Sequence, residues 1–82
     1  MNTITINDLL ATGYNLDVGK NINDEIYVKF KDSKVKDGMF LSGVSGVGNT
    51  FDEAINDYYR KIKGKTLVFN EYEDYIKEVY VL

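Results

Sequence analysis

Between residues 25 and 31, apolar and polar side chains alternate with the period of two that is typical of a half-buried strand. One side of this segment consists of Ile26, Val28 and Phe30, and the other of Tyr27, Lys29 and Lys31. A second strand is expected over residues 39–45. Turn signals at Asp32-Ser33 and Asp37-Gly38 separate the two segments. We therefore expect these two strands to form an antiparallel hairpin.

The main helix is predicted after a glycine-rich turn at residues 43–49. Its apolar residues recur every three or four positions and define one buried stripe. The stripe consists of Phe51, Ala54, Ile55, Tyr58, Tyr59 and Ile62. Thr50 and Glu53 have the spacing of a capping box, in which each side chain accepts an N–H group at the helix start. Gly64 is expected to end the helix, because glycine readily adopts a left-handed conformation.

A short helix is expected near the N-terminal end, over residues 5–13. Thr5 can cap this helix, and Asp8 places a carboxylate where the helix dipole favours negative charge. Gly13 is the natural stop. A strand that begins over residues 3–6 is the alternative interpretation of the same segment.

Two further strands are expected toward the C-terminal end. Residues 65–69 are β-forming, and a turn over residues 70–74 separates them from residues 75–82. The β-branched and aromatic residues of this last segment favour a strand, with a helix as the competing interpretation. The expected order is α-β-β-α-β-β, an α+β fold. We expect a single domain over residues 1–82, with an antiparallel sheet of three to four strands and the main helix packed on one face.

The composition narrows the possible chemistry. The chain has no histidine and no cysteine, which excludes a Ser-His-Asp triad, a thiol nucleophile, a zinc finger and a disulfide framework. A carboxylate-only magnesium or calcium site stays open, but the calcium-loop motif is absent. Asp52, Glu53 and Asp57 gather near the start of the main helix, where a capping role is expected of the carboxylates. We therefore expect no enzyme, no catalytic residue, no metal and no cofactor.

The N-terminal segment has neither a basic region nor a long apolar run, so we expect no signal peptide. No stretch approaches the roughly 18 apolar residues that a membrane-spanning helix needs. The expected location is the cytoplasm, with no membrane partner.

The segment that follows residue 70 alternates carboxylates with tyrosines and is the candidate partner-binding surface. Its residues are Glu71, Tyr72, Glu73, Asp74, Tyr75, Glu78 and Tyr80. Tyrosine buries a large area at little entropic cost and is favoured at protein interfaces. Carboxylates at this density could imitate phosphates toward a basic partner surface. The plainer alternative is a polar turn followed by a strand whose tyrosines cover the sheet.

Eight of the ten basic residues fall into two short segments. They are Lys29, Lys31, Lys34 and Lys36 in the first segment, and Arg60, Lys61, Lys63 and Lys65 in the second. If both segments reached one face, these bases could follow a phosphate backbone while Tyr27 stacked on a base. A nucleic-acid-binding module is therefore the alternative function. The net charge of −3 and the interruption by Asp32 and Asp37 argue against it.

The glycine-rich turn is a third candidate, for an anion. Gly43, Gly46 and Gly48 lead into a helix start whose free N–H groups could hold a phosphate or a carboxylate. The spacing matches neither a P-loop nor a dinucleotide fingerprint, and Thr50 already uses one N–H group. A tight strand-to-helix turn is the plainer interpretation.

Residues 43–55 resemble the strand–turn–helix of HicB-like antitoxin domains. In that family a glycine, a threonine and a Glu-Ala pair open the main helix, as Gly48, Thr50 and Glu53-Ala54 do here. The family often carries an added DNA-binding element, for which 82 residues leave no room. The family's toxin-binding role is therefore not expected here.

Residues 48–69 also resemble small accessory proteins of phages and prophages of low-GC Gram-positive bacteria. The Asn-, Lys-, Ile- and Tyr-rich composition fits such an AT-rich source. Some small acidic phage proteins inhibit host defence enzymes, anti-CRISPR proteins among them, by covering a nucleic-acid site. This resemblance implies a non-catalytic protein that binds a host protein and inhibits host defence. A homodimer paired through the terminal strand is a further interpretation.

Overall fold

The computed structural model describes residues 2–71 and 75–82. Its helices and strands follow one another as β1 (Asn2–Ile4), α1 (Ile6–Ala11), β2 (Leu16–Lys20), β3 (Ile26–Phe30), β4 (Ser33–Asp37), β5 (Phe40–Ser42), β6 (Gly46–Gly48), α2 (Phe51–Ile62), β7 (Thr66–Phe69) and β8 (Lys77–Val81). The predicted α+β class is confirmed. Neither helix is long enough, or apolar enough, to cross a membrane, as far as the described residues go.

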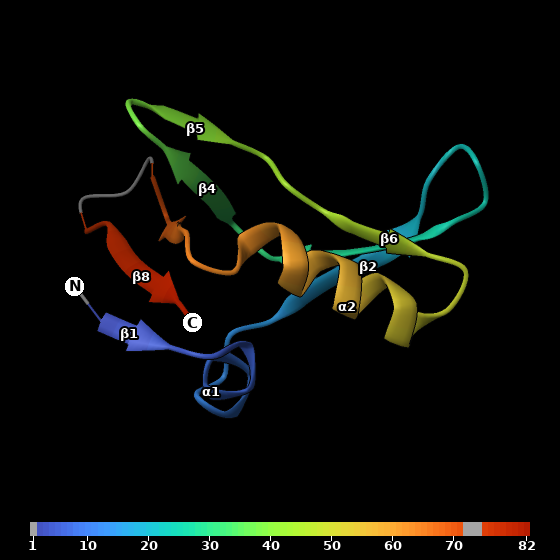
Figure 1. The fold of residues 1–82 in the computed structure, drawn as a ribbon, viewed down its shortest axis with the longest axis horizontal. Coiled ribbons are helices and arrows are strands. Elements are labelled where there is room, and N and C mark those ends of the chain that lie inside the picture. Colours follow the sequence, from blue (N-terminus) through green and yellow to red (C-terminus); the bar gives the residue numbers. More distant parts are fainter. Residues whose placement is uncertain (1, 72–74) are drawn as a thin grey trace.

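The described strands form two sheets rather than one (Figure 1). The larger sheet has five strands in the order β1-β8-β7-β4-β5, and only the pair of β1 and β8 is parallel. The smaller sheet is antiparallel, in the order β2-β3-β6. Helix α2 packs on β3 and β6 of the smaller sheet, so the expected packing of the main helix on one sheet face is found there.

The expected hairpin between residues 25–31 and 39–45 is wrong. Strand β3 pairs with β2 and β6. Residues 33–38 were expected to be the turn of that hairpin, but Ser33–Asp37 form strand β4 between β5 and β7. Asp32 adopts a positive φ of 59° between β3 and β4. This sharp change of direction sends the chain from the smaller sheet into the larger one, and residues 39–45 are then divided between β5 and the start of the connection to β6.

The predicted capping box at the start of α2 is confirmed, and the predicted Thr5 cap of α1 is also part of a capping box. In α1, the Asp8 N–H donates to Thr5 Oγ1 at 3.1 Å, and the Thr5 N–H donates to Asp8 Oδ2 at 3.0 Å. In α2, the Glu53 N–H donates to Thr50 Oγ1 at 3.2 Å, and the Thr50 N–H donates to Glu53 Oε2 at 3.1 Å. The N-terminal strand that was the alternative to α1 is also present, directly before it, as β1.

One hydrophobic core joins both sheets and both helices. Its buried residues are Ile6, Leu9, Val28, Phe30, Val35, Ala54, Tyr58, Ile62, Leu67, Phe69, Val79 and Val81. At its centre the Phe30 N–H donates to the Tyr58 hydroxyl at 3.1 Å. Most of the predicted helix stripe therefore faces this core, and Phe51, in the first turn of α2, is the exception because it stays exposed.

The C-terminal segment forms strand β8, which confirms the strand over the helix for its described part. Strand β8 lies between β1 and β7. Both of its edges are therefore occupied, and the homodimer through a terminal sheet edge is wrong for this strand. Val79 and Val81 point into the core, while Glu78 and Tyr80 point to the opposite side of the sheet.

We use the name outer face for the side of the five-stranded sheet that points away from the core. Glu78 and Tyr80 point to this side, and the strand registers place their cross-strand partners there as well. The residues on this face are Lys34 and Lys36 of β4, Leu41 of β5, Thr66 and Val68 of β7, and Glu78 and Tyr80 of β8.

Candidate functional site

The glycine-rich turn is filled by the protein's own carboxylates. The Val47 N–H donates to Asp57 Oδ2 at 2.9 Å, and the Asn49 N–H donates to Glu53 Oε2 at 2.9 Å. Gly46 lies so close to α2 that a Cβ atom there would be 2.1 Å from the Ala54 carbonyl oxygen. Because the turn packs on the helix and its N–H groups bind internal acceptors, the geometry is that of a tight strand-to-helix connection.

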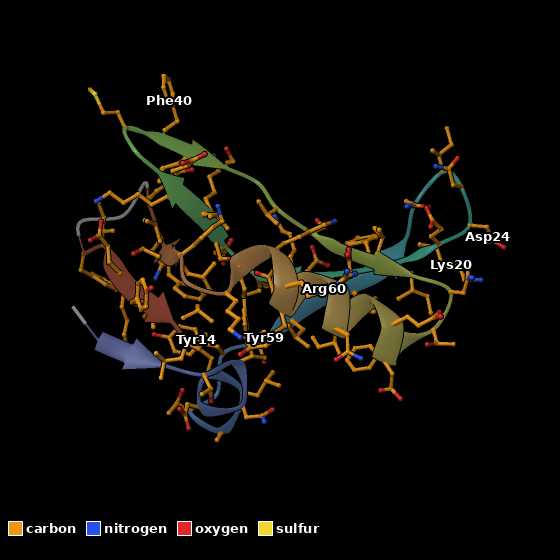
Figure 2. The ribbon with its side chains drawn as sticks, viewed as in Figure 1. Tyr14, Lys20, Asp24, Phe40, Tyr59 and Arg60 are labelled. Atoms are coloured by element: carbon orange, nitrogen blue, oxygen red, sulfur yellow. The ribbon has the colours of Figure 1, made fainter. Side chains whose placement is uncertain are left out.

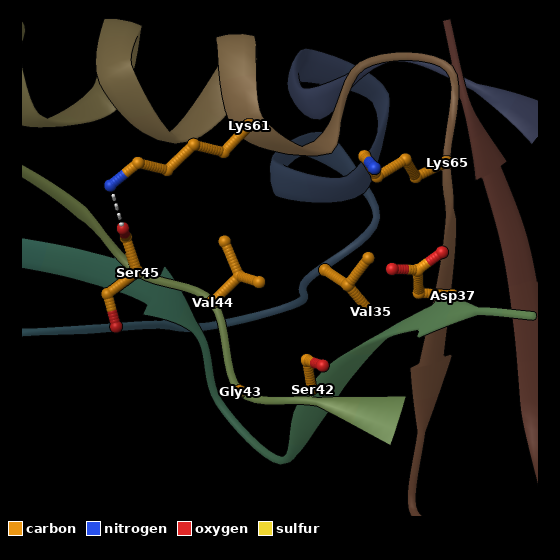
Figure 3. Close-up of a pocket in the computed structure, with 8 residues that line it drawn as sticks. All are labelled: Val35, Asp37, Ser42, Gly43, Val44, Ser45, Lys61 and Lys65. Atoms are coloured by element: carbon orange, nitrogen blue, oxygen red, sulfur yellow. Dashed lines mark hydrogen bonds between the residues drawn. The ribbon is translucent and has the colours of Figure 1, made fainter. Parts of the chain in front are cut away.

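Asp57 is the charged centre of this connection. Its carboxylate binds the Lys61 ammonium and the Arg60 guanidinium, each at 2.8 Å. The hydrogen bonds from Lys61 and from the Val47 N–H hold the pKa of Asp57 below its ordinary value. Lys61 also donates to the Ser45 carbonyl at 2.9 Å (Figure 3). Glu53 therefore caps the helix, and Asp57 anchors the loop.

A cavity of about 450 Å³ lies beside this connection (Figure 3). It is lined by Val35, Asp37, Ser42, Gly43, Val44, Ser45, Lys61 and Lys65. The close-up shows the two lysines reaching toward it from the side of α2 and β7, and Asp37 from β4. The lysine charge is offset in part by Asp37 and by the ion pair of Lys61 with Asp57, so the cavity offers no concentrated positive charge.

The two basic segments are not brought to one face. Lys29 alternates along β3 with the buried Val28 and Phe30, which face α2, so Lys29 lies on the side of the smaller sheet away from that helix. Arg60 and Lys61 lie on α2 itself. The sequence-predicted nucleic-acid residues are therefore divided between the two sides of the smaller sheet and, for Lys34 and Lys36, the outer face of the larger sheet.

Other members of that set are occupied by local contacts. Tyr27 lies over its cross-strand neighbour Gly19, where a Cβ would be 2.7 Å from the tyrosine ring. The Lys63 ammonium lies 5.7 Å from the centroid of the Tyr59 ring. A second depression of about 450 Å³ mixes bases with acids: Asp17, Lys29, Lys31, Asp32, Ser33, Lys34, Asn70 and Glu71. A phosphate backbone would meet about as many carboxylates as ammonium groups there.

The acidic-aromatic candidate surface lies partly on the outer face. Tyr72, Glu73 and Asp74 fall outside the described residues. Tyr75 is largely exposed, and Tyr80 is half-buried on the sheet.

Its described carboxylates have lysine partners. Glu71 forms an ion pair with Lys34, and Glu78 Oε1 lies 3.2 Å from Lys36 Nζ. Acidic and basic residues that the sequence assigns to rival surfaces therefore interleave on a single face. The outer face is close to neutral in its described part, although the chain is acidic.

Part of this face, beside the β4–β5 turn, is apolar, and this feature was not predicted from the sequence. A depression of about 290 Å³ is lined by Lys36, Gly38, Met39, Leu41, Val68, Glu71, Ile76 and Glu78. We name its apolar members, Met39, Leu41, Val68 and Ile76, the apolar patch. Met39 is 97% exposed and Ile76 is 56% exposed. The available signal was Met39-Phe40-Leu41, three large apolar residues directly after a turn glycine.

No three or more acidic side chains of the described chain cluster in a way that could hold a metal ion. No protein-family model matches this chain, and neither the curated proteins nor the solved structures include a significant match. The site must therefore be interpreted from its own geometry.

Proposed function

We propose that this protein is a non-catalytic binding protein whose outer face contacts another protein. The observation that carries the proposal is the apolar patch with its charged rim of Lys36, Glu71 and Glu78. Protein interfaces characteristically have an apolar centre and a polar border, with a few large side chains that supply most of the affinity. Ile76 and Met39 are placed to act as such anchors, because both are largely exposed.

The resemblance to small phage and prophage proteins supports a biological setting for this binding. In the proposal the protein is a phage-type accessory protein, it acts in the cytoplasm of a bacterial host, and it inhibits a host defence protein by stoichiometric binding.

Because of its ion pairs, the outer face fits a different kind of partner from the basic surface that the sequence suggested. Lys34 and Lys36 offset Glu71 and Glu78, so the described face has little net charge to imitate a phosphate backbone. A partner surface with an exposed apolar feature fits it better than a strongly basic groove. Binding should therefore depend only weakly on salt, since screening acts mainly on unpaired charges.

The test is capture of binding proteins from a nuclease-treated lysate of a low-GC Gram-positive bacterium. Ile76→Glu places a charge in the apolar patch, and Ile22→Glu makes the same change at a 99% exposed residue of the β2–β3 loop. We expect the wild type and Ile22→Glu to retain a stoichiometric protein partner that Ile76→Glu loses.

Two results would contradict the proposal. Equal capture by all three proteins would place the contact elsewhere. Capture that disappears with nuclease treatment and falls steeply with salt would support the nucleic-acid-binding alternative instead.

A further inference from the structure

Strand β5 (Phe40–Ser42) is an edge of the five-stranded sheet with one side unpaired. Of the described chain, no other segment lies beyond it at the upper margin of the molecule (Figure 1). Phe40 extends away from the body of the protein (Figure 2) and is 77% exposed. The edge is therefore open to another strand.

The backbone groups that face outward can be identified from the register. Asp37 and Phe40 close the two-residue turn between β4 and β5, and Ser42 pairs with Val35. In an antiparallel ladder, bonded and non-bonded residue pairs alternate. Phe40 and Ser42 therefore direct their N–H and C=O groups toward β4, and Leu41 directs its own groups outward.

Strand β5 is short, at three residues, but it lacks the charged side chains and the proline that also protect sheet edges. Edge strands commonly carry a charged side chain, a proline or a bulge that discourages a second chain. Residues 38–48 contain no charged residue and no proline. A second strand can therefore approach β5 without desolvating a charge on the strand itself.

We propose that β5 pairs with β5 of a second copy of this chain, in an antiparallel two-fold arrangement centred on Leu41. In this register the two Leu41 residues exchange their outward N–H and C=O groups. The large Phe40 lies opposite the small Ser42 of the second copy, and Met39 lies opposite its Gly43. On either side of the central Leu41 pair a large residue thus meets a small one, and the symmetry repeats the same pairing.

The pairing joins the two five-stranded sheets into one. Met39 and Leu41 of each copy then lie beside those of the other on the joined outer face, so the two apolar patches become neighbours. The dimer uses the backbone edge of β5 and leaves Ile76 uncovered. It goes beyond the proposed function and does not depend on it, because a dimer can form whether or not another protein binds.

The oligomeric state of the full chain tests the pairing. Sedimentation equilibrium at protein concentrations of about 10 μM to 1 mM covers the range in which a dimer with a small interface forms. We expect twice the chain mass for the wild type. Leu41→Lys sets two like charges opposite each other at the symmetry axis and should give the mass of a single chain. Ile22→Lys, the matched control, should remain a dimer.

Far-UV circular dichroism of Leu41→Lys separates loss of pairing from loss of folding. A wild type that stays monomeric over the whole concentration range overturns the proposal, as does a folded Leu41→Lys that remains dimeric. Neither outcome bears on the capture test, which uses Ile76.

Cross-linking tests the register independently. The chain has no cysteine, so a single Leu41→Cys introduces its only thiol. Cα atoms of a hydrogen-bonded antiparallel pair lie about 5.5 Å apart, within the range that a disulfide spans. We expect mild oxidation to yield a covalent dimer for Leu41→Cys and not for Ile22→Cys. Equal cross-linking of the two variants overturns the register.

Discussion

The Lys36 ammonium lies 3.2 Å from the Glu78 carboxylate, and the two residues come from strands that flank β7. Their side chains are 47% and 39% exposed, and they border a depression whose floor includes the buried Val68. An exposed ion pair of this kind gains little in water, because its attraction is weakened by solvent and its ordering costs entropy. The pair therefore contributes little to stability, while the two charges offset each other on the outer face.

A double-mutant cycle measures this weak coupling. Lys36→Met and Glu78→Gln, alone and together, should give a coupling energy of about 0.2–1 kcal/mol in urea unfolding. A coupling above about 2 kcal/mol would mean that the pair is held in a far less solvated setting than its exposure indicates.

The hydrogen bond of Tyr58 is expected to contribute more to the free energy of unfolding than this ion pair does. Its hydroxyl is buried and accepts the Phe30 N–H at 3.1 Å. Tyr58→Phe leaves that N–H group buried without its acceptor, which costs about 1–3 kcal/mol. Tyr59→Phe is the matched control, because the Tyr59 hydroxyl donates to the Leu82 carbonyl at an exposed position. Urea unfolding should show a clearly larger loss for Tyr58→Phe, and equal losses would contradict this account.

The same burial raises the pKa of Tyr58 above its ordinary value of 10.0. The folded state therefore favours the neutral phenol. The corresponding stability is complete below about pH 10 and is lost as the pH rises through the raised pKa. We expect the wild type to lose stability in this alkaline range and Tyr58→Phe to lose less. Parallel alkaline profiles for the two proteins would contradict this expectation.

Asp57 makes the opposite contribution in acid. Because the hydrogen bonds from Lys61 and Val47 lower its pKa in the folded state, it stabilises the fold above its unfolded pKa of about 3.9. This stability is lost as the pH falls through the lowered value. Asp57→Asn should therefore be less stable than the wild type at pH 7, and the difference should shrink toward pH 2. A difference independent of pH would show that the charge of Asp57 has no role.

Substitutions at Gly46 and Gly43 test how closely β6 packs on α2. A Cβ at Gly46 would lie 2.1 Å from the Ala54 carbonyl and 2.4 Å from the Tyr58 amide nitrogen, whereas nothing lies within 4 Å of a Cβ at Gly43. Gly46→Ala should destabilise the protein by about 3 kcal/mol or more, since backbone atoms must move. Gly43→Ala should be neutral or slightly stabilising. Thermal unfolding compares them, and similar melting temperatures would contradict the close packing.

Local signals predicted the local structure. The capping box of Thr50 and Glu53, the helix stripe ending at Ile62 and the strands at Ile26–Phe30 and Lys77–Val81 all depend on residues within a few positions of one another. Strand β2 was not predicted because it has only two apolar residues, Leu16 and Val18, and contains Asp17 and Gly19, which are uncommon in strands. Its pairing with β3 stabilises it.

Non-local pairing explains what was missed. Residues 33–48 form three short strands in two sheets, and their partners lie as far away as β7. The same holds for the candidate surface. The sequence indicated Glu78 as acidic and Lys36 as basic, but only the register of β4, β7 and β8 brings them together. The apolar patch likewise joins Leu41 to Ile76, which no local pattern connects.

Contact of the outer face with another protein can be mapped by amide chemical shifts. The partner recovered by nuclease-treated capture is titrated into isotope-labelled protein. We expect the largest chemical-shift changes at residues 39–41, 68 and 76–78, with little change at residues 27–31 and 60–63. The reverse distribution, with the outer face unaffected, would contradict it.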